Sequence, residues 1–472
     1  MRIKLEKIGI NKYKVPKIAG MRVEAIVYAN KAILKDIGQD LSLRQLQETA
    51  TLPRVISPVI GMPDIHQGFG LPIGGIMATK GLISVGAVGM DINCGVRLLV
   101  SNLFYDQKLF SRENMQILIR MIEKAIPIGV GGKRKNIPNG LELRKTVTQG
   151  VKHLLEKGYA LPEDLLCTEE NGCMNGAKFE ALTLKAKKRA EKQIGTLGSG
   201  NHFIEIQKVD EIFDASTSSA WGISKNQICL MIHCGSRALG HQTCVDYTDL
   251  FWKAKSKYGI EVPQKGLAAL PVETKEGQDY FGAMAASVNF AFSNRQMITH
   301  DVRQVFNRFF KNKGVNTKLV LLYDVAHNIA KWEEHGGRRL LVHRKGATRA
   351  LPASHPQNPE KYLKTGHPAI IPGSMGTASY VMVGLPKNKE TFFSINHGAG
   401  RIMSRTRAKK TIKKQDFDLS MENIVYNKPF WLIADEAPGA YKNIHEVIDT
   451  LVEAGLTKKV IKLRPLAVIK GD

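Results

Sequence analysis

Hydrophobic and polar positions alternate with the period of a helix in a few segments of the chain. Apolar residues recur every three or four positions over residues 111–126 and 281–310, which predicts two amphipathic helices, the second of them long. Residues 177–192 show a similar pattern with many lysines, which predicts a third helix with a basic face.

Two further helices are predicted from capping residues. Ser42 and Gln45 have the spacing of a capping box in front of a short helix. The last helix is expected to begin at Asn443, a residue suited to an N-cap, with Glu446 three positions later, and to stop at Gly455.

Short β-like runs and glycine-rich loops fill much of the remaining sequence. Glycine is dense over residues 61–95, and the last third of the chain again mixes short apolar runs with glycine loops. Because helical and β-like segments do not alternate regularly, the pattern favours an α+β fold with layered central sheets over a regular α/β fold. No repeat, linker or low-complexity tract marks a domain boundary.

The charge of the chain points to a polyanionic partner. Lys and Arg number 68 against 43 Asp and Glu, which gives a formal net charge of +25. Many basic residues cluster at residues 185–192, 405–414 and 458–464. Nucleic acid is the commonest polyanion that such a field attracts, although a merely basic enzyme stays possible.

Cysteine usage and hydropathy indicate a folded protein of a reducing compartment. The chain has 472 residues and only six cysteines, too few for a disulfide framework, so any special cysteine is expected to be a ligand or a nucleophile. No run of eighteen apolar residues occurs, and the first residues do not resemble a signal peptide. We therefore expect a cytoplasmic location.

Three β-like runs end on a histidine, at His233, His327 and His397. A strand can hold an imidazole rigidly, and the small or polar residues that follow leave room beside it. A single strand-end histidine is more often structural, and for His397 the roles of metal ligand, base, nucleophile and structural residue all stay open at this point.

Further candidate metal ligands lie in glycine-flanked segments. His202 follows a glycine loop, and Asp91 and Cys94 are spaced D-x-x-C. Thiolate and imidazole ligands favour zinc or another late transition metal, while the carboxylate leaves manganese open. The alternative for Cys94 is a small buried hydrophobic residue.

Glycine loops at 195–201, 371–377 and 396–401 could bind anions through their backbone N–H groups, although glycine loops are also ordinary turns. None of them matches the Walker pattern or a Rossmann fingerprint. Basic residues suited to phosphate stand near these or similar loops: Arg237, Lys345, Arg349, Arg401 and Arg405. Together they indicate a nucleotide or polynucleotide phosphate near a metal.

The motifs, taken together, resemble the RtcB-type RNA ligases. They occur in the order of that family and cover nearly the entire chain: MPDIHQGFGLPIGG (62–75), DINCGVR (91–97), GTLGSGNHFIEI (195–206), HCGSR (233–237), DVAHN (324–328), RKGATRA (344–350), PGSMGT (372–377), NHGAGR (396–401) and EAPGAYK (436–442). The resemblance implies a single α+β domain over residues 1–472. It also implies an enzyme that uses GTP and manganese to join RNA 2′,3′-cyclic phosphate or 3′-phosphate ends to 5′-hydroxyl ends, in tRNA splicing and RNA repair.

The resemblance also implies roles for individual residues. His397 matches the histidine that becomes guanylylated. A pair of Mn²⁺ ions would be held by five residues, with the Cys94 thiolate able to bridge them: Asp91, Cys94, His202, His233 and His327. The nucleotide would be contacted by Asp64, Asn201, Glu205, Asn328, Lys345, Ser374, Arg401, Tyr441 and Lys470, of which Glu205 and Lys470 would read guanine. Arg237 and Arg405 would bind RNA phosphates, and some family members need an archease partner.

Two other functions remain as alternatives. A metal-dependent phosphodiesterase could open cyclic phosphates without ligating, and it would need the metal ligands but not His397, Glu205 or Lys470. A basic RNA-binding protein with a structural metal is the second alternative, and in that case the Asp, Cys and His residues could be dispersed in the fold.

Overall fold

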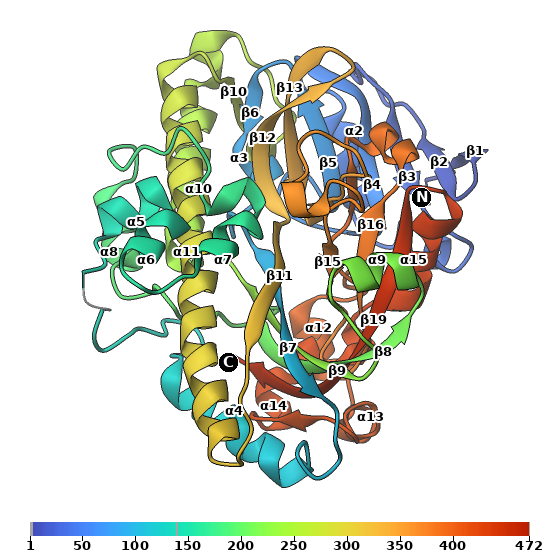
Figure 1. Ribbon diagram of the computed structural model, residues 1–472. Coiled ribbons are helices and arrows are strands. Elements are labelled where there is room, and N and C mark those ends of the chain that lie inside the picture. The colour runs from blue at the N-terminus through green and yellow to red at the C-terminus, as the bar shows by residue number, and fades with distance from the viewer. Residues whose placement is uncertain (1–2, 138–139, 472) are drawn as a thin grey trace.

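Helices and strands are mixed along the whole chain, which confirms the α+β class. The computed structural model describes residues 3–137 and 140–471, so positions 1 and 472 of the expected domain lie outside the described residues. Two large sheets form the centre, with a long helix beside them (Figure 1).

The first large sheet is built mainly from the N-terminal part of the chain. Its seven strands run in the order β1 (Glu6–Gly9), β2 (Lys12–Val15), β3 (Ala25–Tyr28), β4 (Val55–His66), β5 (Ile73–Thr79), β13 (Arg338–Lys345) and β12 (Asn328–His335). The pair β3 and β4 is parallel, and the other pairs are antiparallel.

The second large sheet joins strands from distant parts of the sequence. Its path is β11 (Leu319–Ala326), β7 (Gly95–Phe104), β9 (Gln227–Cys234), β8 (Phe203–Ile212), β19 (Thr457–Lys470), β16 (Ser379–Gly384) and β15 (Ala369–Ile371), and β18 (Val425–Tyr426) pairs with β19. Every residue of β9 is buried, which explains its unbroken apolar run. Two small sheets pair β10 (Ala269–Pro271) with β6 (Leu82–Ser84) and β14 (Ala347–Arg349) with β17 (Ser394–Asn396).

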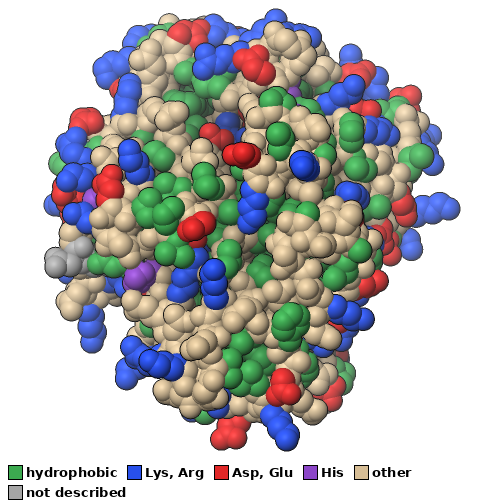
Figure 2. All heavy atoms as spheres, in the orientation of Figure 1, with side chains coloured by type: hydrophobic (Ala, Val, Ile, Leu, Met, Phe, Trp, Pro, Cys, Tyr) green, Lys and Arg blue, Asp and Glu red, His purple; other side chains and the backbone are tan. Residues whose placement is uncertain are grey.

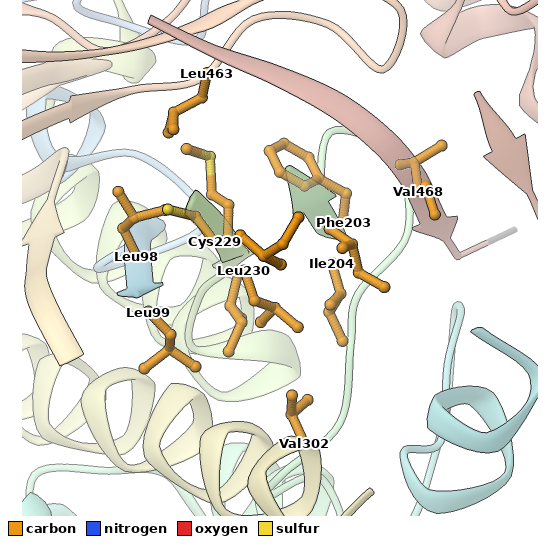
Figure 3. Packing of buried hydrophobic residues seen from close by; sticks show 14 of the residues in the cluster. Leu98, Leu99, Phe203, Ile204, Cys229, Leu230, Val302, Leu463 and Val468 are labelled. Carbon is orange, nitrogen blue, oxygen red and sulfur yellow. The ribbon is translucent and has the colours of Figure 1, made fainter. Parts of the chain in front are cut away.

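One long helix, α11 (Lys275–Lys311), packs along the second sheet and contacts β9. In the core, side chains from β7, β8, β9 and β19 meet, and Val302 of α11 approaches them from one side (Figure 3). The other helices are α1 (Ile33–Asp36), α2 (Ser42–Thr49), α3 (Val85–Val88), α4 (Arg112–Ala125), α5 (Leu143–Gln149), α6 (Val151–Glu156), α7 (Pro162–Leu166), α8 (Leu184–Ala190), α9 (Ala215–Ala220), α10 (Arg237–Ala254), α12 (Arg405–Thr411), α13 (Lys414–Ser420), α14 (Phe430–Ile433) and α15 (Ile444–Glu453). No helix among the described residues is long and apolar enough to cross a membrane.

Three of the helices expected from the sequence are confirmed. The helix expected at 111–126 is α4, whose N-cap Ser111 accepts a hydrogen bond from the backbone of Asn114. The helix expected at 281–310 is α11, which begins earlier because Thr274 caps it. The last helix, α15, is capped by Asn443 and ends before Gly455, which has a φ of +74°.

Two expectations were wrong in detail. Of residues 177–192 only α8 is helical, because the Thr183 side chain accepts a hydrogen bond from the backbone N–H of Ala186 and starts the helix there. The helix at Ser42 forms, but without the capping box: Asp40 accepts the Ser42 N–H at 2.8 Å. The Gln45 side chain instead bonds the backbone of Gly68.

Candidate active site

The five expected metal ligands meet at one end of four neighbouring strands. Asp91 and Cys94 lie just before β7, His202 lies just before β8, His233 lies near the end of β9, and His327 follows β11 directly. The strands are adjacent in the order β11, β7, β9 and β8. Residues separated widely in the sequence therefore come together, which removes the alternative of a dispersed set.

Cys94 lies at the centre of this cluster. Its sulfur is 3.2 Å from Nε2 of His233 and 3.4 Å from Nε2 of His202. Nε2 of His233 is also 3.2 Å from Nε2 of His327, and Nε2 of His202 is 2.8 Å from Asp91. Cys94 thus belongs to two groups of three ligand atoms, one with His233 and His327 and the other with Asp91 and His202.

The electrostatics of the cluster fit metal ions at some ligands and require loss of a proton at others. Burial lowers the pKa of His202, but Cys234, Cys94 and Asp91 outweigh it and hold that pKa well above its usual range, so a metal would displace the proton. Burial holds the pKa of His233 and that of His327 well below their usual range, so both imidazoles are neutral and able to act as ligands. Burial raises the pKa of Asp91, but the neighbouring His202 outweighs it and leaves that pKa low. Burial raises the pKa of the Cys94 thiol to about 11, and a bound metal would deprotonate it. Two close Nε2 atoms with a shared sulfur suit a cation between them.

His397 follows β17 and is oriented by Asp64 of β4. Its Nδ1 is 2.6 Å from Oδ2 of Asp64, and its backbone N–H donates to the same oxygen at 3.0 Å. The His397 ring also packs edge-on against the ring of His327, with centroids 5.2 Å apart. Its Nε2 makes no hydrogen bond to the part of the chain that the structure describes.

Lys442 supports the segment that carries Asp64. The buried ammonium donates hydrogen bonds to the carbonyls of Pro63 at 2.9 Å and Ile65 at 2.6 Å. Burial lowers the pKa of Lys442 to about 8, although Asp64 opposes this shift. The Lys442 ammonium therefore lies next to the backbone on either side of Asp64, the residue whose carboxylate contacts His397.

A cavity of about 810 Å³ opens beside the metal cluster and His397. Its wall includes Asp91, Cys94, His233, His327 and His397. It also includes most of the residues expected to contact nucleotide, namely Asn201, Asn328, Lys345, Ser374, Arg401, Tyr441 and Lys470. A volume of this size suits a nucleotide-sized ligand.

Comparison with known proteins identifies the family. The family model described as "tRNA-splicing ligase RtcB" matches residues 45–471. The tRNA-splicing ligases RtcB of Thermococcus kodakarensis and Archaeoglobus fulgidus are each 43% identical, over 99% of both chains. The chain belongs to the RtcB family. A relative from Entamoeba dispar, RNA-splicing ligase RtcB homolog 1, is 40% identical over 99% of this chain and 94% of its own length.

Membership of the RtcB family makes this chain an RNA ligase, and the family implies dependence on a metal. The structure supplies groups that could hold metal and a cavity next to them. Lys and Arg side chains are spread over the face of this RtcB-family chain seen in Figure 2, with fewer acidic side chains between them. This charge suits an RNA substrate.

Two cavity residues of the RtcB-family chain bond to the backbone around the site. Lys345 donates to the carbonyls of Phe69 and of Gly86, the latter at 3.0 Å. Burial lowers its pKa to about 7. Asn328 donates to the carbonyl of Asp91 at 3.0 Å and accepts from the N–H of Gly346 at 2.9 Å. Asn328 therefore stabilises the loop that contains the expected metal ligands Asp91 and Cys94.

Four expected site residues do not line the cavity in this RtcB-family structure, and one of them, His202, belongs to the metal cluster. Asp64 lies behind His397. Glu205 is buried, accepts a hydrogen bond from Gln207 at 2.7 Å, and has its Oε1 without a partner among the described residues. Arg237 donates to Thr196 at 3.0 Å and to the carbonyl of Gly129 at 2.8 Å.

Arg405, expected to bind RNA phosphate, lies beside residues expected to contact the nucleotide. It lines the cavity, and its Nε is 3.6 Å from Glu436. Sequence reasoning gave no role to Glu436, to Lys442 or to Phe203, which lies on the cavity wall. The signal for them was present, because all three belong to motifs that resemble the RtcB family, EAPGAYK and GTLGSGNHFIEI.

Proposed function

We propose that this RNA ligase uses GTP and a pair of Mn²⁺ ions and works through a covalent His397–GMP intermediate. The observation that carries the proposal is the short contact between His397 and Asp64 at the edge of a cavity that also borders the metal cluster. A phosphodiesterase that only opens cyclic phosphates could use such a histidine as a general base but would form no covalent adduct on it, so the adduct distinguishes the two functions.

The first step is attack of His397 on GTP. With Nδ1–H donated to Asp64, the lone pair lies on Nε2, which attacks the α-phosphorus. An N–P bond forms, the P–O bond to pyrophosphate breaks, and Asp64 stabilises the positive charge that develops on the imidazole. Asp91, Cys94, His202, His233 and His327 would hold the metal pair, which supplies charge neutralisation at phosphate oxygens.

The remaining steps use the same cavity. Water opens the cyclic phosphate to a 3′-phosphate, GMP passes from His397 to that phosphate, and the 5′-hydroxyl then displaces GMP to form the new phosphodiester. Lys345 and Arg401 on the wall offer positive charge to phosphate oxygens. Charge develops on phosphate oxygen at each step, so one set of groups can serve all of them.

The remaining site residues would bind the nucleotide and the RNA. Glu205 and Lys470 would read guanine, Arg237 and Arg405 would meet RNA phosphates, and the other nucleotide contacts would be Asp64, Asn201, Asn328, Ser374 and Tyr441. Residues 1–472 would act as one ligase domain on tRNA or other cleaved RNA, with an archease as a possible activator. The six free cysteines support a reducing, cytoplasmic location.

The proposal is tested with GTP labelled at the α-phosphate. Protein incubated with this GTP and MnCl₂ should retain acid-labile, base-stable label, as a phosphoramidate does, and His397→Ala should retain none. His241→Ala, which alters an exposed histidine, is the matched control and should label normally. Cyclic phosphate opening without label on the wild type would favour the phosphodiesterase, and absence of label with every divalent metal tried would rule the proposal out.

A further inference from the structure

Glu436 binds four groups at one end of the cavity. It ends a short turn of 3₁₀ helix (Ala434–Glu436), and its side chain is almost completely buried. Its Oε1 accepts from Nη1 of Arg401 at 3.1 Å and lies 3.6 Å from Nε of Arg405. Its Oε2 accepts from the hydroxyl of Tyr441 and lies 3.6 Å from Nζ of Lys470.

One carboxylate thus faces three cations in a buried place. Burial raises the pKa of Glu436, but Lys470, Arg405 and Arg401 outweigh it and leave that pKa low, so the carboxylate is ionised. Burial alone would favour the neutral amine of Lys470, and Glu436 is the main group that opposes this effect. Loss of this carboxylate would leave the buried ammonium without its nearest counter-charge.

The other contacts of these residues limit how they can move. Arg401 donates to the carbonyls of Asp435 at 2.6 Å and Met403 at 3.1 Å, and its guanidinium lies 4.9 Å from the ring centroid of Tyr441. Lys470 is held at its backbone, where Asn427 both donates to its carbonyl and accepts from its N–H. Its side chain, a flexible stem that carries three donors, contacts Glu436 and lies over the Phe203 ring. The position of the ammonium therefore depends on Glu436.

We propose that Glu436 is a positioning residue that fixes the Lys470 ammonium and the Tyr441 side chain, and thereby sets the preference of the cavity for a purine base with an oxygen at C6. This inference rests on the proposed use of GTP. One donor of Lys470 faces Glu436, and the others remain available to a base carbonyl. Without the Glu436 carboxylate, the Lys470 ammonium moves or loses its proton. The cavity then no longer discriminates between purine bases with and without an oxygen at C6.

Formation of the labelled His397 adduct tests this role through nucleotide analogues. Glu436→Gln should raise KM for GTP about tenfold, because binding of the base is weakened. The value of kcat should change by less than about threefold, because the groups at the reacting phosphate are unchanged. The preference for GTP over 2-aminopurine riboside triphosphate, which lacks the C6 oxygen, should fall by a similar factor. The preference for GTP over ITP, which differs only at the 2-amino group, should stay unchanged.

Asp435→Asn is the matched control. The Asp435 carboxylate pairs with Lys409, only its backbone carbonyl meets Arg401, and its effect on the pKa of Lys470 is weaker than that of Glu436. The KM for GTP and the base preference of Asp435→Asn should stay within about twofold of the wild type. In a Lys470→Met background, Glu436→Gln should have no further effect on the preference for the C6 oxygen. A wild-type KM and base preference in a folded Glu436→Gln variant would overturn the inference.

Failure of this inference can be distinguished from failure of the proposed function and from misfolding of the variant. If the wild type forms no adduct, the proposed function itself fails. If Glu436→Gln does not fold, as judged by its thermal unfolding, Glu436→Asp decides the matter, because it keeps the charge but withdraws it from Lys470. Glu436→Asp should also weaken the preference for the C6 oxygen, and an unchanged preference in that variant would contradict the positioning role.

Discussion

Oδ2 of Asp64 lies 2.6 Å from Nδ1 of His397 and also accepts the backbone N–H of the same residue. Both the ring and its attachment to the chain are therefore held by one buried oxygen. This contact keeps the proton on Nδ1 and the lone pair on Nε2, the tautomer that a nucleophile requires.

Asp64→Asn should slow formation of the His397 adduct on the order of 10²- to 10³-fold. The amide can donate its own N–H to Nδ1, which favours the opposite tautomer and protonates the attacking nitrogen. The measurement is the single-turnover rate of label transfer from GTP at saturating concentration. Asp40→Asn, at another carboxylate on the cavity wall, is the control and should react within a few-fold of the wild type. Equal rates for Asp64→Asn and wild type would contradict a role for this contact.

A second buried carboxylate, Asp324, should matter for stability. It is fully buried and pairs with Arg97 at 2.7 Å and Arg295 at 2.7 Å. Arg295 also donates to the backbone carbonyls of Asn93 and Cys234, which adjoin metal-ligand positions. Asp324→Asn should lower the free energy of unfolding by about 3–5 kcal/mol, because two guanidinium groups lose a buried partner.

Urea unfolding of the metal-free protein measures this effect. Asp210→Asn is the control, since Asp210 pairs with Lys462 and Arg464 near the surface. Its loss should cost less than about 1 kcal/mol. A change below about 1 kcal/mol for Asp324→Asn would show that the buried network contributes little net stability.

Cys94 belongs to both groups of candidate ligands, so its removal should affect both metal positions. Co²⁺ bound to the wild type should give the near-ultraviolet charge-transfer absorption of a thiolate ligand, and Cys94→Ala should lose it. The number of tightly bound ions per chain should also fall. Cys173→Ala, which alters a half-buried cysteine outside both groups, should keep the absorption and the metal content. A wild-type metal content in Cys94→Ala would exclude a bridging thiolate.

Local sequence patterns predicted individual helices and strands well, but they did not predict which of these elements lie next to one another in the fold. The amphipathic periods of α4 and α11 and the capping residue of α15 are properties of single segments, and the structure confirms them. The meeting of His233 with Cys94 depends on the order of strands in the sheet, which no local pattern contains. Only the family motifs supplied that information before the structure did.

The environments of individual side chains also depended on contacts between distant segments, which local patterns do not contain. Glu436 was missed because a carboxylate in a short turn gives no sign of burial, and its partners Arg401 and Lys470 come from other segments. The basic cluster at 458–464 looked available to RNA. In the fold Lys458 pairs with Asp214 at 2.5 Å, and Lys462 pairs with Glu211 at 2.7 Å. Strand pairing brought these charges together, so the cluster is largely neutralised.

The cluster at 405–414 is a better candidate for RNA contact. It includes α12, which begins at Arg405 on the cavity wall. Charge removal at Arg407 and Lys410, both exposed on α12, should weaken binding of RNA of any sequence. It should also reduce the slope of log affinity against log salt by about one for each RNA phosphate that the variant no longer neutralises.

Lys462→Gln is the matched control, because that ammonium already has carboxylate partners. Binding is measured by fluorescence anisotropy of a labelled RNA over a series of salt concentrations. A slope that is the same in the α12 variant as in the wild type would show that the RNA follows another face.

With Glu205 in its proposed role of reading guanine, binding of GTP should depend on pH. Burial raises its pKa to about 8, against the weaker opposing effects of Gln207 and Lys470, so the free protein carries a protonated Glu205 at neutral pH. A carboxylate that accepts the N–H groups of guanine must be ionised. Binding of GTP should then release a proton below pH 8, and its dissociation constant should fall by up to about tenfold for each pH unit as the pH rises towards the pKa.

Above the pKa of about 8 the affinity should become independent of this group. Glu205→Gln cannot titrate and should bind GTP more weakly, with no such slope between pH 6.5 and 8. The same variant corrects for titration of the GTP phosphates, which both proteins share, so the difference between the two curves isolates Glu205. Isothermal titration calorimetry in buffers of different ionisation enthalpy would count the released proton directly. Parallel curves for the two proteins, or binding without proton release at pH 7, would remove Glu205 from the guanine site.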